Sequence, residues 1–451
     1  MEQRGTGGAG ERRTTLEVVV PLRPGDHATL VHCLSALLQQ TRTPQRVVLV
    51  DDGGPERDHA LQMAREFARA NDIGLAVVRR RWSIGHVATL KRQARESDAD
   101  VLVLLPPSTV LESPDYLQAC VEALDGAVGV GSACGRVEAL WPAHRRRLER
   151  LPAFRHWVAG DGYVDPLAAP GRAARIQAWL AAAMLSHMVR LGLDLPDRAT
   201  MRACGSVVLP AGAVAYRRRY LRDLFNRVEP VRGDDLGAWP GQVIAHAFAT
   251  EGYRAMRIDA VTARIQPPAL SRLPRLCWSG WIGWLQAGYW FDPLLRSPLR
   301  QLTRRWRVRG APHRLEAERR AVEEAFREPF GERITRLQGR PIGRYLLRRS
   351  AVLAGLAVLA WVLVLQGRWT ALGVLALLEL ALACVRVARV APASERGSAV
   401  LHALVSVPLR WGGILLGPVA MLRVASGIWL DRRFRWRRNA HRGRRRRGAR
   451  P

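Results

Sequence analysis

The stretch LEVVVPLRPGDHATLVHCLSALLQQTRTPQRVVLVDDGG, residues 16–54, decides the fold. It places a helical pattern, residues 28–40, between two short apolar runs, residues 16–21 and 46–50. Short apolar runs that end in turn residues are typical of buried parallel strands. Further along, the same alternation predicts these elements: helices at 56–71 and 88–97, and strands at 74–79 and 99–105. We therefore expect an α/β fold, in which an open, mostly parallel sheet carries helices on both faces.

The residues that stand out chemically follow the predicted strands. Sheets of this kind bind ligands at the carboxyl ends of their strands. These ends carry the candidate site residues Pro21, Arg23, Asp51, Asp52, Gly53, Pro106 and Ser108. No GxGxxG follows the first strand and no GxxxxGK(S/T) occurs in the sequence, so a dinucleotide-binding site or a P-loop has no support.

Composition indicates a globular protein whose C-terminal half contains two strongly basic segments. Its 451 residues suit two or three units, and an apolar content of 48% can bury a core. The six cysteines lack CxxC spacing, which argues against a disulfide framework and against a cysteine zinc site. The net charge of +31 is concentrated in residues 271–350 and 431–451. Such an excess points to nucleic acid or to an anionic membrane surface.

The C-terminal third favours the membrane. Residues 351–365 carry no charge, residues 371–385 carry only Glu379, and neither run shows a polar face at helical spacing. We expect a hairpin of two transmembrane helices here, rather than a soluble helical hairpin. The third apolar stretch, residues 400–430, contains prolines, glycines and arginines. It is interpreted as an interfacial or re-entrant segment, or as two short crossings.

Charge also predicts the topology and the domain limits. Arginines flank the hairpin at 348–349, 386 and 389, and the positive-inside rule places them in the cytoplasm with the tail. The expected protein is a multi-pass inner-membrane protein whose basic tail binds anionic lipids. No nucleic-acid partner is expected, because the basic residues crowd beside apolar segments and no groove-reading motif occurs. The predicted limits are a disordered 1–13, an α/β domain at 14–265, interfacial helices at 266–347, the membrane region at 348–430 and the tail at 431–451.

Residues 14–290 resemble the nucleotide-binding half of family-2 glycosyltransferases, which have the GT-A fold. The resemblance rests on a first strand that ends in V-x-P at Pro21 and a second that ends in D-D-G at residues 51–53. It implies a nucleotide-diphosphate sugar as donor, with Asp51 and Asp52 contacting the base and ribose, and with Pro21, Arg23 and Gly53 beside them. The alternative for residues 51–54 is an ordinary polar turn.

Two further segments resemble that family. Residues 84–91, IGHVATLK, are similar to its G-K-x-x-A-L-N segment, with His86 at the basic position and Lys91 at the Asn position. The resemblance implies that a cation here meets the diphosphate, whereas Lys91 could equally lie on a solvated helix face. Residues 201–223 resemble the acceptor-side stretch, which assigns Gly205 to the acceptor side.

The chain departs from the family pattern at three motifs. Pro106, Pro107 and Ser108 stand where the family has the metal-binding D-x-D, so Mg²⁺ or Mn²⁺ is expected only if another carboxylate replaces it. Asp234 and Asp235 offer the catalytic base, but counting back from Gly252 puts residues 240–241 at that position instead. The aspartates could also cap a helix. The Q-x-x-R-W motif, which lines the acceptor channel of processive members, is reduced at residues 277–281 to Trp281, so the resemblance assigns Trp281 to the acceptor side. The Trp-rich segment around it suits an interfacial helix or a core helix.

Two functions from different classes follow. The first is a membrane-anchored glycosyltransferase that moves a sugar from a nucleotide-diphosphate donor to a lipid or polysaccharide acceptor. The second is a catalytically inactive GT-A scaffold or binding subunit, with protein partners, in a bacterial envelope polysaccharide assembly complex. Because three motifs are degenerate, the sequence leaves both open.

Overall fold

The computed structural model describes residues 14–22, 27–51, 57–80, 85–150, 171–232, 240–290 and 341–429, with the single residues 152 and 154. Several sequence predictions lie outside these ranges. They are the disordered N-terminus 1–13, the basic tail 431–451, most of the predicted interfacial region between 291 and 340, and the site residues Arg23, Asp52, Gly53, Asp234 and Asp235.

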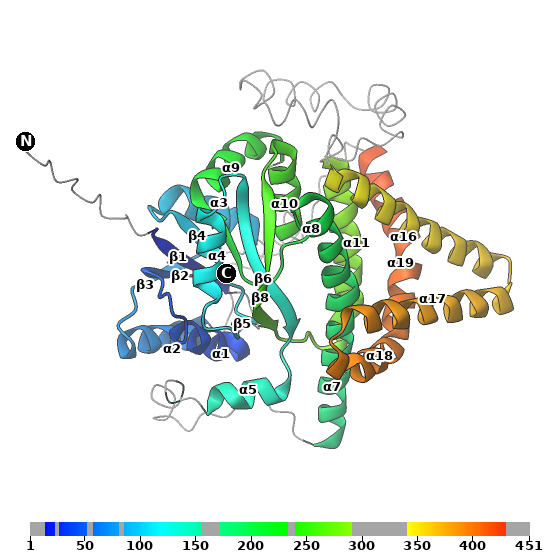
Figure 1. Cartoon of the computed structure of the whole chain (residues 1–451), viewed down its shortest axis with the longest axis horizontal. Coiled ribbons are helices and arrows are strands. Elements are labelled where there is room, and N and C mark those ends of the chain that lie inside the picture. Colours follow the sequence, from blue (N-terminus) through cyan, green and yellow to red (C-terminus); the bar gives the residue numbers. More distant parts are fainter. Residues whose placement is uncertain are drawn as a thin grey trace, which may run out of the picture.

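An eight-stranded sheet in the order β3-β2-β1-β4-β7-β6-β8-β5 forms the centre of the described structure (Figure 1). The strands are β1 Leu16–Leu22, β2 Arg46–Asp51, β3 Leu75–Arg79, β4 Val101–Leu104, β5 Thr109–Leu111, β6 Val130–Ala139, β7 Val214–Arg217 and β8 Arg254–Ile265. Only β5 and β7 run against the other strands. The predicted fold class, a mostly parallel sheet with helices, is confirmed.

Alternation along the buried strands explains the two helical layers. In β4, Val101 and Val103 face one hydrophobic core, whereas Leu102 and Leu104 face another, because successive side chains of a strand point to opposite faces. The first core is covered by α1 His27–Leu38, α2 Arg57–Ala70 and α4 Tyr116–Asp125. The second is covered by α3 His86–Glu96, α9 Arg218–Arg232 and α10 Pro240–Glu251.

A long helical rod lies beside the β6–β8 end of the sheet. It consists of α7 Arg172–Val189, a π-helical turn η1 Arg190–Asp194 and α8 Leu195–Cys204, and it packs on β6 and β8. A shorter helix, α5 Pro142–Glu149, follows β6 directly. The rod connects the sheet domain to the C-terminal helices, since α7 also packs on α18 Arg396–Val405.

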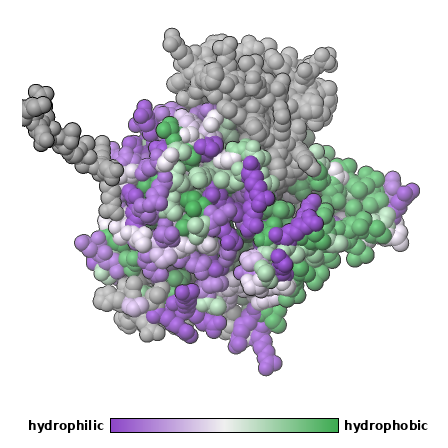
Figure 2. Space-filling model, viewed as in Figure 1, coloured by the Kyte–Doolittle hydropathy of each residue, from purple (hydrophilic) through white to green (hydrophobic). Residues whose placement is uncertain are grey.

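The predicted hairpin is present as two helices that project from the body, α16 Pro341–Leu365 and α17 Trp369–Val390 (Figure 1). The stretch 400–430 forms the end of α18 and one long helix, α19 Val407–Trp429, with Pro418 inside it. Helix α19 runs across the base of the hairpin and packs on α11 Leu273–Trp290 (Figure 1). Figure 2 shows the projecting hairpin as a largely hydrophobic surface with a hydrophilic tip.

Among the residues that the structure describes, three helical segments are long and apolar enough to cross a membrane, judged by length and composition. They are Arg172–Cys204, Trp369–Val390 and Val407–Ser426, and Ala351–Leu365 is a shorter apolar helix. The first was not expected from the sequence. It carries the buried acids Asp194 and Asp197, which face Arg257 of the sheet. The rod therefore packs on the sheet domain along that side.

The lone acid of the hairpin is paired. Glu379 of α17 accepts hydrogen bonds from the Arg410 guanidinium of α19, with N–O distances of 2.9, 3.1 and 3.2 Å. Arg410 Nη1 also lies 3.0 Å from His187 Nε2 of α7. Charged groups in apolar helices are costly unless they are paired in this way. The contact therefore ties the hairpin, α19 and the rod together.

The Trp-rich segment is a helix that packs against protein where it is described. Trp281 Nε1 of α11 donates to the Gly413 carbonyl of α19 at 2.7 Å. A Cβ on Gly417 would stand 2.9 Å from the Trp281 ring, so glycine makes this close approach of helices possible. Trp281 therefore lies in the contact between α11 and α19.

A buried histidine in α10 makes stability depend on pH. His246 Nδ1 lies 2.7 Å from the Gln242 carbonyl, and burial lowers the pKa of His246 to about 4. The unfolded chain takes up this proton near pH 6.5, whereas the folded chain resists it until about pH 4. The stability is thus complete above pH 6.5 and is lost as the pH falls from 6.5 to 4, by on the order of 3 kcal/mol.

We expect the His246→Gln variant to lose less stability as the pH falls. Unfolding by guanidinium in mild detergent, measured between pH 7.5 and 4, should show a smaller pH dependence in the variant, whatever its stability at pH 7.5. Other histidines contribute equally to both proteins, so the difference between them isolates His246. Parallel pH profiles would contradict the assignment.

Candidate functional site

The ends of β1, β2 and β3 lie side by side at one edge of the sheet. Leu22 pairs in register with Asp51, and Asp51 pairs with Arg79. Asp51 is buried, with 2% of its surface exposed, and Pro21 lies opposite Val50. The structure thus places Pro21 and Asp51 at the same carboxyl edge, where the sequence predicted ligand binding.

A buried arginine stands beside Asp51. The Arg80 backbone N–H donates to the Asp51 carbonyl at 3.0 Å. Its guanidinium Nη1 donates to Thr89 Oγ1 at 2.6 Å, and that hydroxyl donates to the Gly85 carbonyl at 2.8 Å. Arg80 therefore places positive charge under the first turn of α3. The sequence prediction missed it, although its position just after the third strand, level with Asp51, was a usable signal.

Helix α3 begins at this edge. Gly85, with φ of 90°, precedes His86, the first residue of the helix, and the first turn holds no acid. A helix N-terminus carries partial positive charge and unpaired N–H groups, which suits a phosphate. His86 is therefore placed at the N-terminus, as a phosphate-binding role requires. Lys91 lies more than one turn further along the helix and is partly exposed.

The segment that stands where the family has its metal-binding D-x-D motif is a hydrogen-bonded turn. Pro106 and Ser108 connect β4 to β5, and Thr109 N–H donates to the Pro106 carbonyl at 2.9 Å. Gln266 N–H, just after β8, donates to the Ser108 carbonyl at 2.7 Å. In the described part of the chain, no group of three or more His, Cys, Asp or Glu side chains could hold a metal ion.

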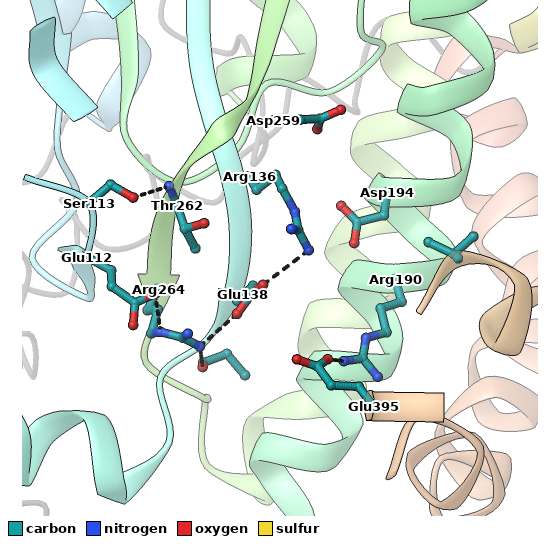
Figure 3. Close-up of polar contacts among 12 residues, drawn as sticks. Glu112, Ser113, Arg136, Glu138, Arg190, Asp194, Asp259, Thr262, Arg264 and Glu395 are labelled. Carbon is teal, nitrogen blue, oxygen red and sulfur yellow. Dashed lines mark hydrogen bonds and ion pairs between the residues drawn. The ribbon is translucent and has the colours of Figure 1, made fainter. Parts of the chain in front are cut away.

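Two carboxylates in this region form ion pairs with the same arginine. Arg264 of β8 contacts Glu112 at 2.7 Å and Glu138 of β6 at 2.8 Å (Figure 3). Glu138 also contacts Arg136 at 3.2 Å. The two acids are therefore neutralised by arginines, and the residues around 106–108 that the structure describes do not fit a divalent metal.

The sheet and the rod meet through charged side chains. Figure 3 shows Arg136 and Glu138 projecting from β6 toward the rod, which carries Arg190 and Asp194. Deeper in this contact, Arg257 Nη1 of β8 lies 3.0 Å from Asp194 and 3.5 Å from Asp197. Burial raises the pKa of Asp194, which the Arg257 charge opposes. This buried arginine fixes the rod against the sheet.

Gly205 lies away from the candidate site. It ends α8 in the left-handed conformation, with φ of 63°, and a Cβ there would stand 3.0 Å from Nη1 of Arg254. Arg254 starts β8, so this position is at the amino edge of the parallel strands, opposite Asp51. From the same stretch, Gly212 reaches the carboxyl edge, beside Val137 and Ala263.

The start of α10 reaches the candidate edge. A Cβ on Gly241 would stand 2.3 Å from the Pro210 carbonyl oxygen, and Pro210 leads into Gly212 at that edge. The two aspartates predicted to supply the catalytic base, Asp234 and Asp235, come shortly before this helix in the sequence. They lie outside the described residues. Trp281, predicted on the acceptor side, contacts α19.

The family comparison covers the strands that form the candidate edge. The model for the family described as Glycosyl transferase family 2 matches residues 18–178, which include β1 to β6. The chain carries a family-2 glycosyltransferase domain. Asp51, Arg80, His86 and Ser108 all lie within the matched residues of this glycosyltransferase domain. No curated protein matches the sequence.

Solved structures with some likeness include the following two. One is the mannosyltransferase PcManGT from Pyrobaculum calidifontis in complex with GDP-Man and Mn²⁺. It is 14% identical, with 90% of this chain and 88% of that chain covered and a TM-score of 0.41. Another is TarS of S. aureus, which is 12% identical, with 60% of this chain and 40% of that chain covered and a TM-score of 0.34.

Proposed function

We propose that the protein transfers a sugar from a nucleotide-diphosphate donor to a lipid or polysaccharide acceptor at the carboxyl edge of the sheet. The observation that carries the proposal is the convergence of buried Asp51, buried Arg80 and the N-terminus of α3 at one edge, inside the family match. Carboxylates suit the hydroxyl and N–H groups of a nucleoside, and the cationic groups suit its diphosphate.

Each group has a role in donor binding. Asp51 and Asp52 accept hydrogen bonds from the base and ribose, with Pro21, Arg23 and Gly53 around them. His86, Lys91 and the helix N-terminus face the diphosphate. Arg80 adds a planar donor fork, which grips phosphate oxygens more firmly than a point charge does. These roles require no metal at residues 106–108.

The transfer step then forms one bond and breaks another. The acceptor oxygen attacks the anomeric carbon, the bond from that carbon to the diphosphate oxygen breaks, and the nucleoside diphosphate leaves with the electron pair. Asp235, or its neighbour Asp234, takes the proton of the acceptor hydroxyl. The charge that develops on the leaving group is stabilised by Arg80 and the α3 terminus.

Nucleotide binding tests the site without assuming turnover. Calorimetric titration of the full chain in mild detergent should show UDP or UDP-sugar binding that changes little with Mg²⁺ or Mn²⁺. Asp51→Asn and Asp52→Ala should each weaken binding roughly ten- to a hundredfold, because each removes an acceptor of ligand hydrogen bonds. Ser108→Ala is the matched control and should bind as the original chain does.

Strong dependence on Mn²⁺ would show that an acid outside the described residues replaces the D-x-D pair. Thermal unfolding of each variant separates a lost contact from a lost fold, since Asp51 is buried. Activity is then measured as sugar transfer and donor hydrolysis with a panel of UDP- and GDP-sugars, with and without Mn²⁺.

The inactive scaffold is the second candidate function. The observation that favours it is the turn at Pro106–Ser108, whose nearby acids Glu112 and Glu138 are held by Arg264. A scaffold of an envelope polysaccharide complex would bind nucleotide, or none, and would release no sugar from any donor of the panel. Turnover of one donor decides for the transferase.

We also propose a multi-pass inner-membrane location with the sheet domain and the basic tail in the cytoplasm. It is supported by the hydrophobic surface of the projecting hairpin (Figure 2), and by the arginines that flank the base of the hairpin in the sequence. Anionic lipids are the expected partners of that base and of the tail. Envelope-biosynthesis proteins remain the proposed protein partners.

A further inference from the structure

A ladder of backbone hydrogen bonds connects the turn at Ser108 to the residues just before Trp141. Gln266 N–H donates to the Ser108 carbonyl at 2.7 Å, and Leu140 N–H donates to the Ile265 carbonyl at 2.8 Å. Residue 141 therefore follows the end of β6 directly across β8 from the turn at Ser108. Trp141 lies at the same carboxyl edge as the proposed transfer chemistry.

Three rings from distant segments meet at His402 of α18. Trp141 stacks on His402, with ring centroids 5.3 Å apart and planes 26° apart. Trp179 of α7 meets His402 edge-on, at 6.1 Å. His402 is buried between the two tryptophans, whereas 37% of the Trp179 surface is exposed. We name these three residues the aromatic junction.

The aromatic junction opens onto an apolar surface with a basic margin. Ile176 and Trp179 of α7 and Leu401 and Leu404 of α18 are all exposed large hydrophobic residues. Exposed arginines lie close in sequence to them, at 172, 175 and 396. Helix α18 packs on both α7 and α17, so it joins the helices of this surface to the hairpin. Apolar side chains with a basic margin suit the headgroup level of an anionic bilayer.

We propose that the aromatic junction binds a membrane lipid acceptor. Its hydrocarbon chain stays in the bilayer along the exposed face of α7 and α18, and its polar head reaches Trp141 at the carboxyl edge. A soluble polysaccharide would need no apolar path between the edge and the hairpin, so the lipid is the acceptor class that this surface favours. The inference rests on the proposed glycosyltransferase function, whose acceptor it specifies.

Photo-crosslinking of the full chain in nanodiscs tests the proposal. Two phosphatidylglycerol probes are used, one with a diazirine in its acyl chain and one with a diazirine on its head group. Mass spectrometry should find the acyl probe on peptides 172–179 and 396–405, and the head-group probe on the peptide that contains Trp141. Val128 is an internal control, since 74% of its surface is exposed, beside Tyr220 at the opposite edge of the sheet. It should remain unlabelled.

A substitution tests whether lipid binding at Trp141 depends on the exposed Trp179. Trp179→Ser should lower head-group labelling at Trp141 by about tenfold, as expected for one lost aromatic contact with the ligand. Val128→Ser is the matched control and should leave this labelling unchanged. The same Trp179→Ser protein should bind UDP as the original chain does, which shows that its donor site is intact.

The outcomes separate the two proposals. Labelling of the hairpin alone, with residues 141, 172–179 and 396–405 unlabelled and UDP still bound, overturns the lipid-acceptor inference and leaves the proposed function standing. Labelling of the junction without binding of any nucleotide sugar removes the acceptor role, because the proposed transferase itself then fails.

Discussion

Arg257→Met will lower the free energy of unfolding by about 3–5 kcal/mol, because it removes the cation from two buried carboxylates. Arg257 Nη1 lies 3.0 Å from Asp194 and 3.5 Å from Asp197, and all three side chains are almost fully buried. Methionine fills much of the space but compensates neither charge. The rod that carries both acids should then separate from β8.

Asp259→Asn is the matched control for this change. Asp259 contacts the same guanidinium at 2.8 Å, but 65% of its side chain is exposed. An exposed pair contributes about 1 kcal/mol or less. Denaturant unfolding in mild detergent measures both variants.

Adding Asp194→Asn to Arg257→Met should recover part of the lost stability, because one of the two uncompensated charges is then gone. Similar losses for Arg257→Met and Asp259→Asn would show that the buried acids do not depend on Arg257.

Gly241→Ala will displace the start of α10 and reduce both stability and transfer. The added Cβ would stand 2.3 Å from the Pro210 carbonyl oxygen, and a backbone atom cannot rotate away as a side chain can. Overpacking of this kind costs about 1–3 kcal/mol or more. A misplacement of about 1 Å near a reacting group can lower a rate about a hundredfold. We expect a loss of that order, because the proposed base lies just before this helix.

Gly192→Ala serves as the control, because a Cβ there meets no atom within 4 Å. Alanine is also the better helix former, by roughly 1 kcal/mol. Thermal unfolding and sugar transfer are measured on both variants. If Gly241→Ala keeps the thermal stability and the transfer rate of Gly192→Ala, the close packing of α10 on Pro210 has no functional role.

Local sequence patterns were sufficient for the order of strands and helices up to residue 105. The apolar runs at 16–22, 46–51 and 101–104 became strands because they can be buried only between two helical layers. The helix predicted at 88–97 begins two residues earlier, at His86, since Gly85 with its positive φ sets the start. The projecting hairpin was likewise predictable, because its uncharged runs have no polar side to turn toward water.

Residues whose roles depend on distant partners could not be predicted in this way. Arg80 looked like one more arginine in a chain with 70 Lys and Arg residues, until β3 placed it beside Asp51. Gly205 belonged to a family-like stretch, yet the path of the chain leaves it at the opposite edge. The apolar segment 172–204 gave no sign that its two acids would face Arg257.

The sequence alone determined the fold class, the apolar hairpin and the lack of metal-binding side chains at residues 106 and 108, and it predicted the carboxyl edge as the place for a ligand. All of these depend on residue type and on short-range periodicity, which the chain carries locally. Only the tertiary structure decided which residues meet: Asp51 with Arg80 through the backbone, and Glu379 with Arg410 and Trp141 with His402 through their side chains, the last two pairs being 31 and 261 positions apart. Strand register and helix packing set these contacts, and both arise from burial across the whole molecule.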